Sequence, residues 1–160
     1  DPLRLVRVRD TLQRLHLQAE LKVGDARSPQ AWWDGRPFDA ILLDAPCSAS
    51  GIVRRHPDVR WLRRASDIGD LARTQRALLD TLWPLVRPGG RLVYATCSVF
   101  RAEGAGQISA FLQRHADASA GQAPGHLLPL TDNPPQAGAT VPAHLPAGDG
   151  FFNARLDKQP

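Results

Sequence analysis

The chain of 160 residues is 42% hydrophobic, carries a formal net charge of +4, and contains two cysteines and no methionine. A chain of this length can form one domain that buries about 70% of its unfolded surface, and neither a collagen-like nor a wholly disordered composition fits. No apolar run approaches the ~20 residues of a membrane span, no signal peptide opens the sequence, and two cysteines are too few for a disulfide-stapled scaffold.

Two features of the composition bear on function. The absence of methionine leads us to expect a fragment of a longer protein, and therefore an incomplete site. The basic charge is nearly all arginine, with 18 Arg and 2 Lys. Arginine suits phosphate binding and base stacking, so nucleic acid is a candidate partner. A coding bias toward arginine on an ordinary surface explains the count equally well.

The first part of the chain predicts four elements. Apolar residues recur at helical spacing over residues 3–15, which predicts an amphipathic helix. Residues 20–23 alternate and then meet a Gly-Asp pair, which predicts a short strand. Residues 28–37 are expected to form a loop with one helical turn. The apolar run 38–43 lacks alternation, which favours a strand buried on both faces.

The later part continues the alternation of helices and strands, with a Pro-Gly-Gly turn expected at residues 88–90. Proline, glycine and alanine dominate residues 117–148, which predicts a poorly structured insert. The other expected elements are helices over residues 67–86 and 103–115 and strands over 91–95 and 150–156.

Helices that alternate with short apolar strands indicate an α/β domain with a mostly parallel sheet. In such a sheet, ligands bind beyond the carboxyl ends of the strands. Four candidate site residues directly follow expected strand ends, so we expect them on one edge of the sheet: Asp25, Asp44, Cys47 and Cys97.

Each cysteine has a structural and a functional interpretation. Pro46 fixes the backbone, so a rigid turn would hold Asp44 and Cys47 at a set separation. Cys97 follows a strand, where a thiol of lowered pKa can act as a nucleophile. Inert burial is the commoner explanation for a single cysteine. Two cysteines at equivalent strand ends favour a shared function, and a cytosolic α/β domain makes a disulfide between them the weaker alternative.

The spacing of two motifs makes the sequence more specific. The segment 44–51 reads Asp-Ala-Pro-Cys-Ser-Ala-Ser-Gly, and Thr-Cys-Ser follows at 96–98, fifty residues after the first cysteine. This pattern resembles the paired-cysteine signature of the RNA cytosine-5 methyltransferases, the Sun/Fmu/NOL1 family. Residues 54–64 and 149–152 are similar to a bacterial branch that modifies 16S ribosomal RNA.

The resemblance implies a Rossmann-like, class I methyltransferase fold that uses S-adenosylmethionine. It also implies an RNA substrate, 16S rRNA above all, and a cytoplasmic monomer without a metal ion or a membrane partner. Residues 1–160 would be part of the catalytic domain, with residues 117–148 as an insert within it.

The same resemblance assigns roles to site residues. Cys97 would attack the cytosine, Cys47 would assist release, and Asp44 would hydrogen-bond the ring edge. Asp25 would lie beside the adenine of the cofactor, and Asp44 would border the cofactor pocket. Arginines around Trp61 would hold the phosphates of an unstacked RNA segment: Arg54, Arg55, Arg60, Arg63 and Arg64.

The chain departs from the family pattern at three places. It lacks the glycine-rich turn after a first strand, so we expect the amino-terminal strands to be missing and the fragment alone not to bind S-adenosylmethionine tightly. Ala49 and Ser50 stand where the family more often has Gly-Thr. Glu103 retains one acid of a family acidic pair, and Gly104 stands where the family has asparagine, so no role passes to Gly104.

Two alternatives stay open. One is a methyltransferase acting on tRNA or another RNA, since base choice depends on contacts outside the signature. The other is a non-catalytic RNA-binding remnant with buried thiols. Amino methylation of a base is disfavoured, because that chemistry uses an Asn/Asp-Pro-Pro-aromatic turn and this chain has Pro46-Cys47.

Overall fold

The computed structural model describes residues 2–129 and 148–160. Two compact units make up the chain, residues 1–36 and residues 37–160. Within residues 2–129 and 148–160, no helix is long and apolar enough to cross a bilayer.

The first unit contains helix α1 (Pro2–Arg14) and a single 3-10 turn at Pro29–Ala31. Both elements confirm the sequence-based expectations. The strand expected at residues 20–23 does not form. Alternation produces a strand only where a neighbouring strand can accept its backbone hydrogen bonds, and the described part of this unit contains none.

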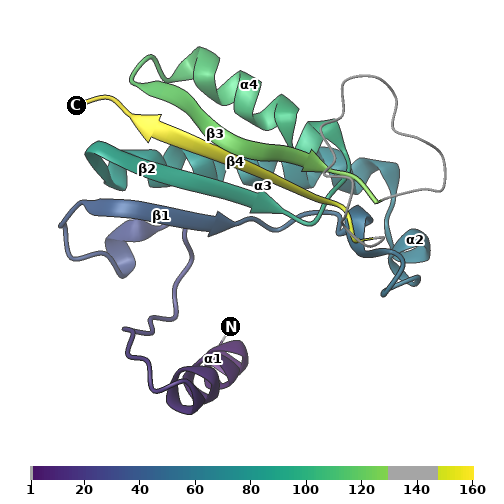
Figure 1. Cartoon of the computed structure of the whole chain (residues 1–160), viewed down its shortest axis with the longest axis horizontal. Helices are drawn as coiled ribbons and strands as arrows, with labels where there is room; N and C mark the ends of the chain where they lie inside the picture. Colours follow the sequence, from purple (N-terminus) through teal and green to yellow (C-terminus); the bar gives the residue numbers. More distant parts are fainter. Residues whose placement is uncertain (1, 130–147) are drawn as a thin grey trace. The chain divides into compact units, whose positions relative to one another are not determined.

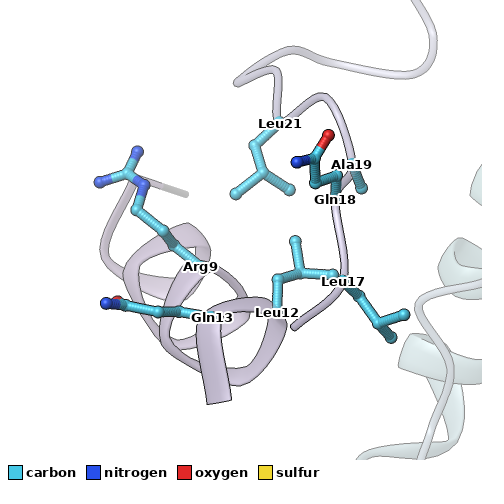
Figure 2. Close-up of a pocket in the computed structure, with 7 residues that line it drawn as sticks. All are labelled: Arg9, Leu12, Gln13, Leu17, Gln18, Ala19 and Leu21. Carbon is cyan, nitrogen blue, oxygen red and sulfur yellow. The ribbon is translucent and has the colours of Figure 1, made fainter. Parts of the chain in front are cut away.

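An open hollow of about 640 Å³ lies between the end of α1 and the segment that follows it. Figure 2 shows Leu12, Leu17 and Leu21 around this hollow, with Arg9 on the helix. Its lining holds no acid, thiol or imidazole, so we assign no chemistry to it.

The second unit is a four-stranded sheet with the order β1-β2-β4-β3 (Figure 1). The strands are β1 (Phe38–Asp44), β2 (Val86–Thr96), β3 (Ala118–Leu127) and β4 (Phe151–Lys158). β1 and β2 pair in parallel, whereas β4 runs antiparallel to both β2 and β3. β1, β2 and β3 therefore point the same way, and β4 alone runs against them.

The α/β class is confirmed, but the expectation of a mostly parallel sheet is met only in part. Three of the four strands share a direction, yet only the β1–β2 pair is parallel. Parallel neighbours need a crossover segment. Helix α3 provides one between β1 and β2, whereas β4 enters the sheet between β2 and β3 as an antiparallel strand.

Three helices accompany the sheet: α2 (Val59–Leu62), α3 (Ala65–Leu82) and α4 (Ala105–Arg114). Helices α3 and α4 lie on one face, behind the strands in Figure 1. Alternate residues of β2 and β4 are buried, as expected when helices cover a single face. The core includes Leu79, Trp83, Leu92, Tyr94, Phe111 and Leu156.

The expectation that β1 is buried on both faces is wrong. Leu43 is 7% exposed, but Leu42 is 73% exposed. β1 is an edge strand of the sheet, and among the described residues nothing packs closely on Leu42. An uninterrupted apolar run does not by itself show how many layers surround a strand.

Two further corrections concern glycine- and proline-containing segments. Residues 88–90 lie within β2, at a register shift opposite Phe38 and Ala40, rather than in a separate turn. Residues 118–127 form β3 instead of belonging to a poorly structured insert, because they pair with the backbone of β4. The pairing is interrupted by an irregularity between Gly121 and Gly125. The rest of the expected insert, 130–147, lies outside the described residues.

Candidate active site

Both cysteines lie just beyond the carboxyl ends of the parallel strand pair. Asp44 of β1 is in register with Ala95 of β2, and the Ala45 amide donates to the Ala95 carbonyl at 3.0 Å. The two strands therefore end side by side. Cys47 Sγ lies 3.4 Å from Cys97 Sγ, and both thiols are free and partly exposed.

The cysteines belong to two segments that we call the first thiol loop (residues 45–52) and the second thiol loop (residues 97–100). The Gly51 amide donates to the Cys97 carbonyl at 2.9 Å, which ties the first loop to the second. The Gly150 amide donates to the Gly51 carbonyl at 2.7 Å. The segment before β4 thus completes a chain of backbone contacts around the thiol pair.

A buried carboxylate lies against both thiol loops. Glu103 is 0% exposed, and its Oε2 accepts hydrogen bonds from Ser48 Oγ at 2.5 Å and Ser98 Oγ at 2.6 Å. The Ser48 amide donates to Oε1 at 2.8 Å. Sequence reasoning gave Glu103 no role, since its contacts come from segments about fifty residues apart.

Gly104 has a steric explanation. A Cβ atom at this position would come within 2.6 Å of the His126 ring and 2.8 Å of the Phe152 ring. His126 and Phe152 lie ring to ring, with centroids 4.5 Å apart. The space that a larger residue would need is filled by these two side chains, so glycine fits here.

The thiol of Cys47 is held in its protonated form. Burial above all, and the neighbouring Cys97 thiol, raise the pKa of Cys47 to about 12, although hydrogen bonds from the Ala49 and Cys97 amides act to lower it. At neutral pH Cys47 therefore carries its proton, and its sulfur lies 3.4 Å from that of Cys97.

We predict that Cys47 resists alkylation at pH 8. Since a thiol reacts as its thiolate, raising the pKa from 9.0 to about 12 lowers the thiolate fraction at pH 8 about a thousandfold, and the reaction with iodoacetamide should be far slower than in the unfolded protein. Mass spectrometry of the Cys47 peptide measures the rate in the Cys97→Ser variant, where burial still raises the pKa. The same variant in urea is the control, and equal rates in both states would contradict the prediction.

The two carboxylates predicted at the cofactor differ in their surroundings. Asp44 is exposed, and within the described ranges its carboxylate has no hydrogen-bond or ion-pair partner. Asp25 accepts hydrogen bonds from the Arg27 side chain and amide, which lower its pKa to about 2. Asp25 belongs to the first unit, whereas the sheet belongs to the second, and the cofactor role of Asp25 stays a prediction.

The arginines predicted to hold RNA fall into three groups. Arg55 Nε lies 2.5 Å from Asp149 Oδ2, and Arg54 Nε lies 3.9 Å from Oδ1 of the same carboxylate. Arg63 Nε donates to the Ser48 carbonyl at 3.1 Å, so it contacts the first thiol loop. Arg60 and Arg64 have exposed positions beside Trp61, whose side chain is 85% exposed.

Comparison with known proteins identifies the family. The sequence family described as 16S rRNA methyltransferase RsmB/F matches residues 1–157 of the chain. The chain belongs to the RsmB/F family. The motifs of the sequence had implied the wider family of RNA cytosine-5 methyltransferases. The family match now covers nearly the full length of the chain.

Individual RsmB/F relatives are similar over the same extent. The ribosomal RNA small subunit methyltransferase B of Serratia proteamaculans (strain 568) is 53% identical over 158 residues, and that of Vibrio cholerae serotype O1 is 51% identical over 159. Each alignment covers 99% of this chain and 35% of the relative. The chain thus spans about a third of the length of these RsmB/F proteins.

Solved structures agree with the RsmB/F assignment. NSun6 from Pyrococcus horikoshii, crystallised with SFG, superposes with a TM-score of 0.76 at 28% identity, over 100% of this chain and 40% of NSun6. A methyltransferase homologue from Pyrococcus horikoshii gives 0.73 at 28% identity, over 99% of this chain and 51% of the homologue. The mixed sheet described above is therefore a methyltransferase fold.

Proposed function

We propose that the intact protein transfers a methyl group from S-adenosylmethionine to C5 of a cytosine in 16S ribosomal RNA, and that this chain supplies the catalytic thiols. The proposal depends on one observation, the pair of free thiols 3.4 Å apart at the ends of β1 and β2. Two comparisons support it. Relatives are named as ribosomal RNA small subunit methyltransferases, and NSun6 was crystallised with SFG, an analogue of S-adenosylmethionine.

The chemistry explains why a thiol is needed. C5 of cytosine is a weak nucleophile, so the Cys97 thiolate first forms an S–C6 bond, which makes C5 enamine-like. C5 then bonds to the methyl carbon, whose bond to the sulfonium sulfur breaks. A base removes the C5 proton, the C–H electron pair rebuilds the C5=C6 double bond, and Cys97 leaves as a thiolate.

Cys47 suits the release step. While Cys97 is free, burial and the neighbouring sulfur keep the pKa of Cys47 near 12. Once Cys97 is bound to carbon, its contribution to the raised pKa is removed. Cys47 can then lose its proton to solvent, and the resulting thiolate accepts the proton from C5. It remains beside the sulfur that must depart.

Among the residues present, the Asp44 carboxylate is suited to bind a methyl donor. When bound, S-adenosylmethionine supplies an electrophilic methyl group. The Asp44 carboxylate is exposed at the carboxyl end of β1 and has a free acceptor capacity within the described chain, so it can accept hydrogen bonds from an amino group of the donor or from the cytosine edge. The Asp25 carboxylate is already held by Arg27.

The exposed surface around α2 fits an RNA partner. Trp61 offers an uncovered aromatic face, and Arg60 and Arg64 flank it in the sequence. An exposed indole can stack on an unpaired base, while guanidinium groups contact phosphates. Arg54 and Arg55 would first have to exchange Asp149 for phosphate.

The test of the proposed function is a trapped intermediate. In the intact protein, Cys47→Ala should leave a covalent RNA–protein adduct, because Cys97 still attacks but release is blocked. Denaturing electrophoresis with labelled 16S rRNA detects the adduct. The double variant Cys47→Ala/Cys97→Ala is the control and should give none.

Other outcomes of this experiment separate the alternatives. An adduct with tRNA but not with 16S rRNA would assign a different RNA substrate. No adduct in the Cys47→Ala variant, together with no methyl transfer by the unmodified protein, would favour the non-catalytic remnant.

A further inference from the structure

We propose that Glu103 is the positioning residue that holds the two thiols in contact, through a single carboxylate shared by Ser48 and Ser98. These serines each directly follow a cysteine, Cys47 and Cys97. The catalytic meaning of this inference rests on the proposed function, but the positioning itself can be measured without it.

The carboxylate joins the two thiol loops at one atom. Glu103 Oε2 accepts both serine hydroxyls, at 2.5 Å from Ser48 and 2.6 Å from Ser98. Because both hydroxyls donate to the same oxygen, a displacement of either loop lengthens its hydrogen bond to an atom that also holds the other loop. Hydrogen bonds this short fix the separation of the serines, and with it the separation of the preceding cysteines.

The other oxygen fixes the first thiol loop from two sides. Glu103 Oε1 accepts the Ser48 amide at 2.8 Å and Gln75 Nε2 at 3.1 Å. Gln75, on α3, also donates to the Pro46 carbonyl at 2.9 Å. Pro46, before Cys47, is thus hydrogen-bonded to Gln75, and Ser48, after it, to Glu103; these two buried side chains are hydrogen-bonded to each other.

Glu103 is itself held by the strand that leads to Cys97. Tyr94 Oη donates to the Glu103 carbonyl at 2.8 Å, and Tyr94 is a buried residue of β2. The Glu103 backbone therefore cannot shift without disturbing the core. The carboxylate is built on a rigid support, which a positioning residue requires.

The burial of the Glu103 carboxylate explains why all of these hydrogen-bond donors must be present. Four donors reach the two oxygens, which is the acceptor capacity of an ionised carboxylate. None of the ion pairs formed by residues 2–129 and 148–160 includes Glu103. A buried polar group is stable only if its hydrogen bonds are made, so a displacement of either loop that breaks one of them is disfavoured.

The first experiment measures how well the thiols are held together. In glutathione buffers, Cys47 and Cys97 lose two electrons and two protons to form a disulfide, and one oxidised glutathione becomes two reduced molecules. The equilibrium constant reports the effective concentration of one thiol at the other. In the intact protein, Glu103→Ala should lower this equilibrium constant at least tenfold. Glu103→Gln, which keeps one acceptor oxygen, should lower it about threefold.

Gln107→Leu is the matched control. Gln107 is 8% exposed, lies on α4, and donates to the Ala72 carbonyl at 2.8 Å. Its loss removes a buried hydrogen bond without touching either thiol loop, so the disulfide equilibrium should not change. If Glu103→Ala does not fold, the Glu103→Gln variant alone decides. An equilibrium constant equal to that of Gln107→Leu would overturn the inference.

The second experiment separates positioning from the proposed reaction. Glu103→Gln should lower kcat for methyl transfer at least tenfold and leave KM for 16S rRNA unchanged, because Glu103 is buried and does not contact RNA. An equal loss in Gln107→Leu would contradict a specific role. If even the unmodified protein transfers no methyl group, the proposed function fails, and the disulfide equilibrium still tests the positioning.

Discussion

Replacing Cys97 with alanine should abolish methyl transfer, lowering the rate at least about a thousandfold. Without the thiolate, no bond forms at C6 and C5 keeps its weak nucleophilicity. Transfer of labelled methyl groups to 16S rRNA by the intact protein measures the effect. Cys97 lies just beyond the carboxyl end of β2, and burial, the largest cause of the raised pKa of Cys47, persists in this variant, so we expect Cys47 not to take over the attack.

The two cysteine variants should fail in different ways. Cys97→Ala should bind RNA as the unmodified protein does but form no adduct, whereas Cys47→Ala should accumulate one. Retained methyl transfer in Cys97→Ala would contradict the assignment of the nucleophile. An exchange of the two outcomes would reverse the roles of the two thiols.

Gly51→Ala should destabilise the folded protein by on the order of 3 kcal/mol. A Cβ atom at Gly51 would overlap the carbonyl group of Gly150. The backbone cannot move aside easily, because the Gly51 amide donates a hydrogen bond to Cys97 and the Gly51 carbonyl accepts one from Gly150. Thermal unfolding of the intact protein measures the change, and methyl transfer should fall with it.

Gly69→Ala is the control for this prediction. Gly69 lies in α3, and the nearest atom to an added Cβ is Arg73 Nη1 at 3.6 Å. Alanine favours a helix over glycine, so this variant should be neutral or more stable by about 0.5–1 kcal/mol. Equal losses in both variants would show that the contact between Gly51 and Gly150 has no special importance.

Local patterns were sufficient to predict most of the elements that carry the site. The apolar run ending at Asp44 and the one ending before Cys97 are β1 and β2, and parallel pairing alone brings their ends together. The proximity of the thiols is therefore a consequence of topology. The helices at α1, α3 and α4 follow from apolar spacing in the same way.

Features that depend on distant partners could not be predicted locally. β3 contains two glycines and a proline between Ala118 and Leu127, and only its pairing with β4 makes it a strand. The exposure of Leu42 depends on what packs on the sheet. The only sequence signal for Glu103 was that it retains one acid of a family acidic pair, whereas its hydrogen bonds depend on Ser48, Gln75 and Ser98.

The position of β4 in the sheet has a consequence for the order of assembly. β4 separates β2 from β3 and pairs with both, yet it is translated after them. On the ribosome, the facing edges of β2 and β3 must therefore wait unpaired until residues 151–158 emerge from the exit tunnel. Gly150, which closes the first thiol loop through Gly51, emerges just before them. The thiol loops of the nascent chain thus complete their backbone contacts only after residues 150–158 have been translated.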